Sequence, residues 1–127
     1  MPLQAVLETV LYYEAAVEEE VERFYRDALG LRRVSRFGDG MVFRLGDSLL
    51  LLFDAGKTSA RPDERARHGA SGSVHACFLV TAGEYERWKG ELEVLDEVTW
   101  PAGVRSFYFR DPAGNLLEIA EGDLWPA

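Results

Sequence analysis

Cysteine is nearly absent from this sequence, with a single residue, Cys77, among 127. One thiol excludes an intrachain disulfide and the zinc motifs that are built from several cysteines. Basic residues are also scarce, because 14 Lys and Arg stand against 22 Asp and Glu and give a net charge of −8. Binding to a phosphate backbone needs clustered positive charge, so we expect no nucleic-acid partner.

Long apolar runs are missing as well. No stretch approaches the roughly 20 residues that span a bilayer, and the first residues, MPLQAVLETV, have neither a basic start nor a cleavage site. We therefore expect a cytoplasmic protein with no membrane partner. With 47% hydrophobic residues the chain has the composition of an ordinary globular domain. Its length allows a hydrophobic core that needs no disulfide bonds or metal ions for stability.

The same order of predicted strands and helix occurs twice along the chain. An apolar segment is followed by an amphipathic helix, in which apolar residues recur at helical spacing, and then by three β-leaning segments. In the first half these segments are 3–13, 15–29, 31–37, 41–45 and 49–53. In the second half they are 73–80, 84–92, 94–100, 104–110 and 116–121. Both halves read as βαβββ, which predicts an α+β fold.

We expect a single domain over residues 1–127. Its parts are module one (3–54), a linker (55–72), module two (73–121) and a tail (122–127). The linker is polar and long for a compact domain, which indicates a crossover between halves or a mobile lid. We expect His68 within it to be a solvated loop residue. The acidic run EEEVER, which begins at Glu18, is expected to be a solvated helix face.

Glu118 is the polar residue that stands out in the last predicted strand. The preceding sequence, DPAGN, is rich in turn formers and allows a tight reversal of the chain. Alternation along the strand then places Glu118 on one face between Leu116 and Ala120. A buried carboxylate without a partner costs several kcal/mol unless it is paired, protonated or bound to a cation. Glu118 therefore needs a partner from elsewhere in the chain.

Laying the two halves together indicates where that partner lies. The segment ETVLYY matches HACFLV, which makes Glu8 the counterpart of His75. The segment SLLLLFDAG matches NLLEIAEGD, which makes Leu51 the counterpart of Glu118. Two similar sheets that curve toward each other would bring these four positions to the middle of one concave cavity. Three of the four side chains can bind a metal.

Three segments resemble the vicinal oxygen chelate superfamily, also called the glyoxalase, bleomycin-resistance and extradiol-dioxygenase superfamily. They are FYRDALGL, VHACFLV and RSFYFRDPAGNLLEI, and the resemblance extends from about Leu7 to Glu121. It implies two βαβββ modules that form a curved, mixed sheet around one cavity with a divalent metal at its centre.

Carried over position by position, the resemblance implies metal ligands at Glu8, His75 and Glu118, whereas Leu51 occupies the place of a fourth ligand. One imidazole and two carboxylates suit Mn²⁺, Fe²⁺, Zn²⁺ or Mg²⁺. The implied function is binding of a small oxygen-rich substrate, with the metal as a Lewis acid for lyase, isomerase or dioxygenase chemistry.

Other residues are candidates for contact with a substrate. Tyr12, on the Glu8 face of its strand, and Tyr108 are candidates for proton handling or for substrate orientation. Arg105 could bind a substrate carboxylate or form a surface ion pair, and Cys77 could be a nucleophile or a small packing residue. The residues that we expect to bind substrate are Arg105, Trp100, Cys77 and Leu51.

Two other functions stay open beside a metal-dependent enzyme. The first is a non-catalytic antibiotic-binding protein of the bleomycin-resistance type, because an aromatic cavity in an acidic protein attracts cations. The second is an unrelated α+β dimer of ferredoxin-like half-units, in which Glu118 is protonated or ion-paired. Small two-module chains of the resembled superfamily and the apolar tail favour a homodimer.

Overall fold

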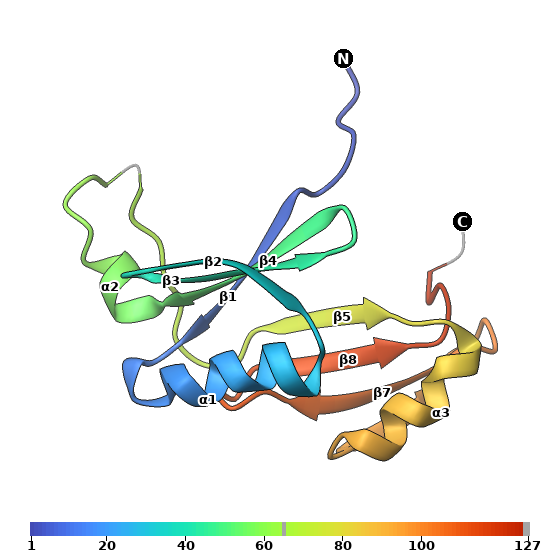
Figure 1. Ribbon diagram of the computed structural model, residues 1–127. Helices are drawn as coiled ribbons and strands as arrows, with labels where there is room; N and C mark the ends of the chain where they lie inside the picture. Colours follow the sequence, from blue (N-terminus) through green and yellow to red (C-terminus); the bar gives the residue numbers. More distant parts are fainter. Residues whose placement is uncertain (65, 126–127) are drawn as a thin grey trace. The chain divides into compact units, whose positions relative to one another are not determined.

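The computed structural model describes residues 1–64 and 66–125. The chain divides into two compact units, Met1–Gly72 and Ser73–Ala127. Each unit holds one four-stranded mixed sheet together with helical segments, so the predicted α+β class with two βαβββ modules is confirmed (Figure 1). Among the described residues, no helix has the length and apolar character that a membrane crossing requires.

The sheet of the first unit has the strand order β1-β4-β3-β2. Strand β1 runs parallel to β4, and the other neighbours are antiparallel. The elements are β1 (Glu8–Tyr13), a 3-10 turn η1 (Ala15–Val17), α1 (Glu18–Arg23), a π-helical turn η2 (Phe24–Ala28), β2 (Arg32–Phe37), β3 (Gly40–Leu45), β4 (Ser48–Asp54) and α2 (Ala55–Ser59).

Helix α1 and turn η2 cover one face of this sheet. Met41 and Phe43 of β3 are completely buried there, and the ring of Tyr25 in η2 lies 5.8 Å from the ring of Phe43. Because strand residues alternate between faces, the intervening positions point to the other side. We call that side the far face of module one. It carries Glu8, Val10, Tyr12, Leu51 and Phe53.

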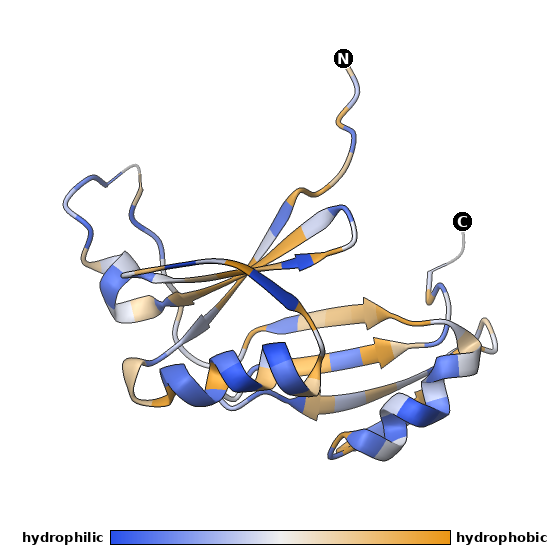
Figure 2. Ribbon diagram, in the orientation of Figure 1, coloured by the Kyte–Doolittle hydropathy of each residue, from blue (hydrophilic) through white to orange (hydrophobic). Residues whose placement is uncertain are grey.

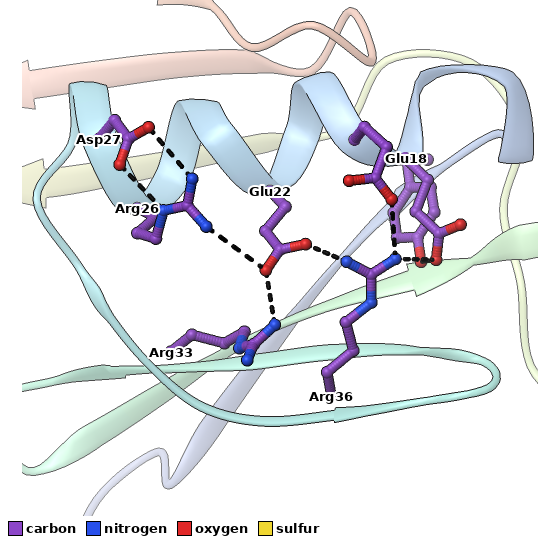
Figure 3. Close-up of polar contacts among 8 residues, drawn as sticks. Glu18, Glu22, Arg26, Asp27, Arg33 and Arg36 are labelled. Atoms are coloured by element: carbon purple, nitrogen blue, oxygen red, sulfur yellow. Dashed lines mark hydrogen bonds and ion pairs between the residues drawn. The ribbon is translucent and has the colours of Figure 1, made fainter.

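An ion-pair network joins α1 to the edge strand β2 (Figure 3). Glu22 of α1 is only 5% exposed. One of its carboxylate oxygens accepts a hydrogen bond from Arg33 at 2.6 Å, and the other accepts one from Arg36. The prediction that the whole EEEVER run is solvated is therefore wrong for Glu22. The reason is that two arginines of β2 project toward α1 and neutralise its charge.

The structure also corrects several predicted boundaries. Strand β1 begins at Glu8 rather than at residue 3, because its neighbour β4 begins at Ser48 and its register places Leu49 opposite Glu8. The start of the predicted linker is helical, since Asp54 caps α2 by accepting hydrogen bonds from the backbone N–H groups of Gly56 and Lys57 at 3.0 and 3.2 Å. The helix predicted over 15–29 is divided into η1, α1 and η2.

The sheet of the second unit repeats the same topology, with the order β5-β8-β7-β6 and a parallel pair β5–β8. Its elements are β5 (His75–Leu79), α3 (Ala82–Glu91), β6 (Asp96–Thr99), β7 (Arg105–Arg110) and β8 (Leu116–Ala120). Figure 2 shows mainly hydrophobic colour on β5 and β8 and extensive hydrophilic colour on α3. The central strand β8 is mostly buried, whereas β5 lies at the edge of the sheet and is partly exposed.

Helix α3 covers one face of the second sheet. Tyr85 of α3 is completely buried, and its ring lies 5.4 Å from the ring of Phe107 on β7. Phe107 and Phe109 therefore belong to the core face, and Tyr108 between them belongs to the other face. The sequence alone does not show which of these aromatic residues face the core, and this alternation decides it.

The turn between β7 and β8 fixes the start of two strands. Oδ1 of the buried Asp111 accepts hydrogen bonds from the backbone N–H groups of Ala113 and Asn115, both at 2.9 Å. Gly114 supplies the left-handed conformation that the turn needs, with φ of +86°. The side chain of Asn115 then accepts a hydrogen bond from the backbone N–H of Val74 at 3.3 Å. The start of β5 is thereby held beside the start of β8.

Candidate functional site

The site in the second unit is built on one row of residues across three strands. The register places Cys77 of β5 and Tyr108 of β7 directly opposite Glu118 of β8. Directly opposite residues share one face of a sheet, and His75, two residues before Cys77, lies on the same face. This is the face that α3 does not cover. The fold thus gathers four polar side chains there from three strands.

His75 and Glu118 form the centre of this site. Nε2 of His75 lies 3.2 Å from Oε1 of Glu118, and Nδ1 lies 2.8 Å from the carbonyl oxygen of Leu116. A carbonyl oxygen can only accept a hydrogen bond, so Nδ1 carries the proton. Nε2 then either carries a second proton, which makes an ion pair with Glu118, or presents a lone pair to a carboxylate. The second arrangement is repulsive unless the carboxyl group is protonated or a cation lies between the two atoms.

Glu118 also has an unsatisfied oxygen. The residue is 3% exposed, and its Oε2 is buried without a hydrogen-bond partner among the described residues. A buried carboxylate oxygen without a partner is strongly unfavourable. The burial that the sequence predicts for Glu118 is therefore present, and the contact of Oε1 with His75 leaves Oε2 unsatisfied.

A cavity of about 740 Å³ opens over this face of the sheet. Its polar part contains His75, Cys77, Tyr108 and Glu118. Its apolar part lies around the next row of residues, Leu79 and Ala120, and is closed by Trp100, Leu124 and Trp125. Such a volume is in the range of small-molecule sites. The arrangement suits a ligand with a polar head and an apolar body.

Burial and the neighbouring carboxylate keep two groups in the cavity protonated. Partial burial, followed by the charge of Glu118, raises the pKa of the Tyr108 hydroxyl above its usual value. The same two causes raise the pKa of the Cys77 thiol to about 12. At neutral pH both groups therefore act as hydrogen-bond donors. A thiol with this pKa is a poor nucleophile, which favours the packing role for Cys77.

Alkylation of Cys77 tests this point. We expect iodoacetamide to modify the native protein at least about ten times more slowly at pH 7.5 than it modifies the unfolded protein, because the thiolate fraction falls as the pKa rises. The rate should still be rising at pH 10, where an ordinary thiol has already levelled off. Mass spectrometry of quenched samples measures both rates. A native rate that equals the unfolded rate would contradict the raised pKa.

The predicted equivalence of the two modules is visible in the strand registers. Glu8 lies opposite Leu49 and Val10 opposite Leu51. In the second unit His75 lies opposite Leu116 and Cys77 opposite Glu118, so His75 corresponds to Glu8 and Cys77 to Val10. Leu51, which is 7% exposed, stands where the second module has Glu118. Glu8 is exposed at the start of β1 in the first unit.

The fit of a metal ion follows from these donors. The structure brings together two of the three predicted ligands, His75 and Glu118, within one unit. Among the described residues, no group of three or more His, Cys, Asp or Glu side chains is arranged to hold a metal. The protonated Nδ1 of His75 turns Nε2 toward the carboxylate, as in histidines that bind metals. Together with the unsatisfied Oε2 of Glu118, this pair fits a divalent cation.

Two of the predicted substrate-binding residues lie in different surroundings. Trp100 lines the cavity, and its indole N–H donates a hydrogen bond to Ser106 at 2.8 Å. Arg105 lies on the face covered by α3, where it pairs with Glu121 and Glu86, both at 2.8 Å, and stacks over Tyr85. Of the two roles considered for Arg105 from the sequence, its position fits the surface ion pair and not contact with a substrate.

Sequence reasoning missed a cluster on the far face of module one. His68, expected to be solvated, is half-buried, and its Nδ1 lies 2.7 Å from the hydroxyl oxygen of Tyr12. Its ring packs edge-on against Phe53 at 4.9 Å. The expectation for His68 was wrong because the polar loop folds back onto the sheet. No local pattern in the sequence announces such a long-range contact.

The two βαβββ modules and the polar pair on the uncovered face of the second sheet define a scaffold for binding small molecules. The chain belongs to the Glyoxalase/Bleomycin resistance protein/Dioxygenase superfamily, whose family model matches residues 19–119. The alternative of an unrelated ferredoxin-like dimer is therefore wrong.

Particular relatives support this assignment. A crystal structure of lactoylglutathione lyase from Agrobacterium tumefaciens is similar, with a TM-score of 0.89, 38% identity and full coverage of both chains. The glutathione transferase FosA of Serratia marcescens is 30% identical over 105 residues, which are 80% of this chain and 70% of that protein. A glyoxalase-related enzyme from Fulvimarina pelagi shares the fold, with a TM-score of 0.70, 23% identity and coverage of 98% and 92%.

Proposed function

We propose that this chain is a metal-dependent enzyme of the glyoxalase type. In this proposal Glu8, His75 and Glu118 hold a divalent cation, and the cavity of the second unit receives a small molecule with two neighbouring oxygens. The observation that carries the proposal is the contact between Nε2 of His75 and the carboxylate of Glu118, whose second oxygen has no partner among the described residues. One imidazole and two carboxylates suit Mn²⁺, Fe²⁺, Zn²⁺ or Mg²⁺.

A divalent cation in this place supplies Lewis-acid chemistry, which favours charge on a substrate oxygen. The protein groups around it bind and orient the substrate. The carbonyl of Leu116 holds His75 with Nε2 toward the site. The protonated hydroxyl of Tyr108 can donate a hydrogen bond to an oxygen of the substrate. Leu51 contributes no ligand atom from module one, which leaves room for substrate oxygens.

The substrate class that we propose is a 2-hydroxy thioester or a related compound with adjacent oxygens. One relative is a lactoylglutathione lyase and another a glutathione transferase. S-lactoylglutathione carries a hydroxyl on the carbon beside a thioester carbonyl, so its two oxygens are neighbours. Leu79, Leu124 and the two tryptophans at the apolar part of the cavity can pack against the apolar groups of such a molecule, which are the methyl of its acyl group and the methylene beside its sulfur.

Metal analysis and a substrate assay together test this proposal. Protein purified without chelator is expected to contain, or to take up on soaking, about one equivalent of a divalent cation per chain. The loaded protein is then expected to form S-lactoylglutathione from methylglyoxal and glutathione, the favourable direction of the lyase reaction, followed by the rise of the thioester absorbance, and the chelated protein is not. A metal content below about a tenth of an equivalent with no uptake would rule out the metal site.

A specific observation favours a second candidate, binding of a planar antibiotic without catalysis. The rings of Trp100 and Trp125 lie 5.5 Å apart at the cavity, and Asp123 stands beside them. Aromatic faces next to a carboxylate attract planar cations. Under this alternative, a cationic aromatic ligand quenches tryptophan fluorescence equally in the wild type and in Glu118→Gln, and no divalent metal is needed.

A further inference from the structure

The apolar part of the cavity in the second unit forms a recognition site beside the polar row. Its walls come from two strands, the residue after β6 and the tail, and they are Leu79, Trp100, Ala120, Leu124 and Trp125. We call these five residues the aromatic pocket. All of them belong to the unit that begins at Ser73, so the walls of the pocket come from one unit.

Two large apolar side chains of the aromatic pocket face water. Trp125 is 76% exposed and Leu79 is 72% exposed. Exposed apolar surface that gathers at a cavity marks a place where a ligand binds. The release of water from both side chains favours the binding of an apolar group. The pocket therefore fits an apolar part of the ligand.

The strand register gives the distance between the pocket and Glu118. Leu79 lies opposite Ala120, and Cys77 lies opposite Glu118. Because the two rows are two residues apart on the same face, they are separated by about 7 Å along the strands. When the oxygens of a ligand lie near Glu118, a group attached to the oxygen-bearing carbon therefore points to the pocket or away from it, and only the first direction offers apolar contacts.

The size and the character of the pocket decide which part of the ligand it receives. The methyl of a lactoyl group covers only a small part of two tryptophans and two leucines. Beyond the methylene beside its sulfur, glutathione carries two carboxylates and an ammonium group, which lose hydration in apolar surroundings. The part that fits is the acyl substituent, in a substrate where this substituent is larger than methyl.

The two tryptophans favour a planar ring over a flexible chain. The indole N–H of Trp100 donates a hydrogen bond to the buried Ser106 at 2.8 Å, and the backbone N–H of Trp125 donates to Oδ1 of Asp123 at 2.8 Å. The two rings lie 5.5 Å apart and are inclined by 59°. Tilted rings at this spacing are the geometry in which aromatic groups attract one another. A rigid ring also loses less conformational entropy on binding than a chain does.

We propose that the aromatic pocket selects substrates whose 2-hydroxyacyl group carries an aromatic ring in place of the methyl, and that Trp125 is the specificity-determining residue. The inference rests on the proposed function, because that function places the ligand oxygens near Glu118. Trp125 supplies a wall of the pocket from the tail, and Leu79 supplies its floor from the sheet.

Calorimetry with two matched thioesters tests the preference. S-mandeloylglutathione and S-lactoylglutathione differ only in a phenyl group in place of a methyl. The wild type is expected to bind the mandeloyl compound at least about tenfold more tightly, as burial of several more apolar carbons requires. The preference should appear in metal-loaded and in chelated protein, because no pocket residue is a proposed metal ligand. The analogue with a cyclohexyl ring should bind about threefold more weakly than the mandeloyl compound, because it cannot make ring–ring contacts.

Variants assign the preference to the pocket. Trp125→Ala is expected to reduce the affinity ratio of the two thioesters to about two, and its exposed position makes loss of folding no explanation. Leu79→Gln keeps the length of the side chain, makes it polar and should also lower the ratio. The matched control Trp88→Ala should keep the ratio, because Trp88 lies on α3 and does not line the cavity.

The results separate this inference from the proposed function. Equal affinity of the wild type for the two thioesters, an unchanged ratio in Trp125→Ala, or no binding of either compound would overturn the specificity role. Equal affinity for the cyclohexyl analogue and the mandeloyl compound would overturn the aromatic class of substrate. Metal content is measured on the same samples. A preference for the mandeloyl compound in protein that takes up no metal would count against the proposed function and would support the role of the pocket.

Discussion

Glu118→Gln is expected to abolish the retention of a divalent metal. Glutamine has nearly the same shape as glutamate but brings a neutral amide oxygen in place of a carboxylate, so the charge that would hold the cation is lost. The loss of one ligand and one charge should lower metal affinity by at least about a hundredfold. Elemental analysis after gel filtration measures the effect. Formation of S-lactoylglutathione from methylglyoxal and glutathione by the variant should fall in parallel.

Two further variants make this result specific. Glu93→Gln removes an identical charge from an exposed position before β6 and should leave metal content unchanged. His75→Gln should lose metal as Glu118→Gln does, because the same cation would lie between the two side chains. Full metal content in Glu118→Gln would show that His75 and Glu118 are only an ion pair.

The fold was predictable because its signals are local and occur together. Strand parity, the helix periodicity before Gly30 and the turn formers after Asp111 each depend on neighbouring residues. Because the pattern occurs twice, it also predicted which positions of the two modules are equivalent. The strand registers confirm that Leu51 and Glu118 occupy equivalent places relative to β1 and β5.

The polar pair in the second unit was predictable for a related reason. Glu118 drew attention because alternation placed it among apolar residues, and the module repeat then selected His75. Both inferences depend on strand period and on pairing between β5 and β8, which are regular. The three-ligand set that adds Glu8 stays a prediction. The homodimer and the cytoplasmic location also stay predictions.

Contacts made by loops and by long side chains were not predictable. The contact between His68 and Tyr12 joins residues 56 positions apart. Glu22 was assigned to a solvated face because its sequence neighbours are acidic, but Arg33 and Arg36 reach it from β2. Both cases depend on how a charged segment folds back onto the sheet. Periodicity describes which face a residue occupies and not which distant group meets it there.

Asp111→Ala is expected to lower the stability of the second unit by about 3 kcal/mol, because hydrogen bonds to a buried carboxylate are among the strong ones. The carboxylate accepts from the backbone N–H groups of Ala113 and Asn115 and from the side chain of Asn115, each at 2.9 Å. For a domain of this size the melting temperature should fall by about 10 °C. Differential scanning calorimetry and urea titration measure the two quantities.

Asp111→Asn and Asp27→Ala separate the turn from a general loss of charge. Asp111→Asn keeps one oxygen for the two backbone donors but sets its amide N–H group against that of Asn115, so an intermediate loss is expected. Asp27→Ala removes a carboxylate that is bound to Arg26 at the surface and should change stability little, because solvent screens an exposed ion pair. Because Asn115 also holds Val74, the residue before His75, the Asp111 variants should bind metal more weakly even where they are folded. Equal stability of Asp111→Ala and Asp27→Ala would show that the turn does not set the geometry of the site.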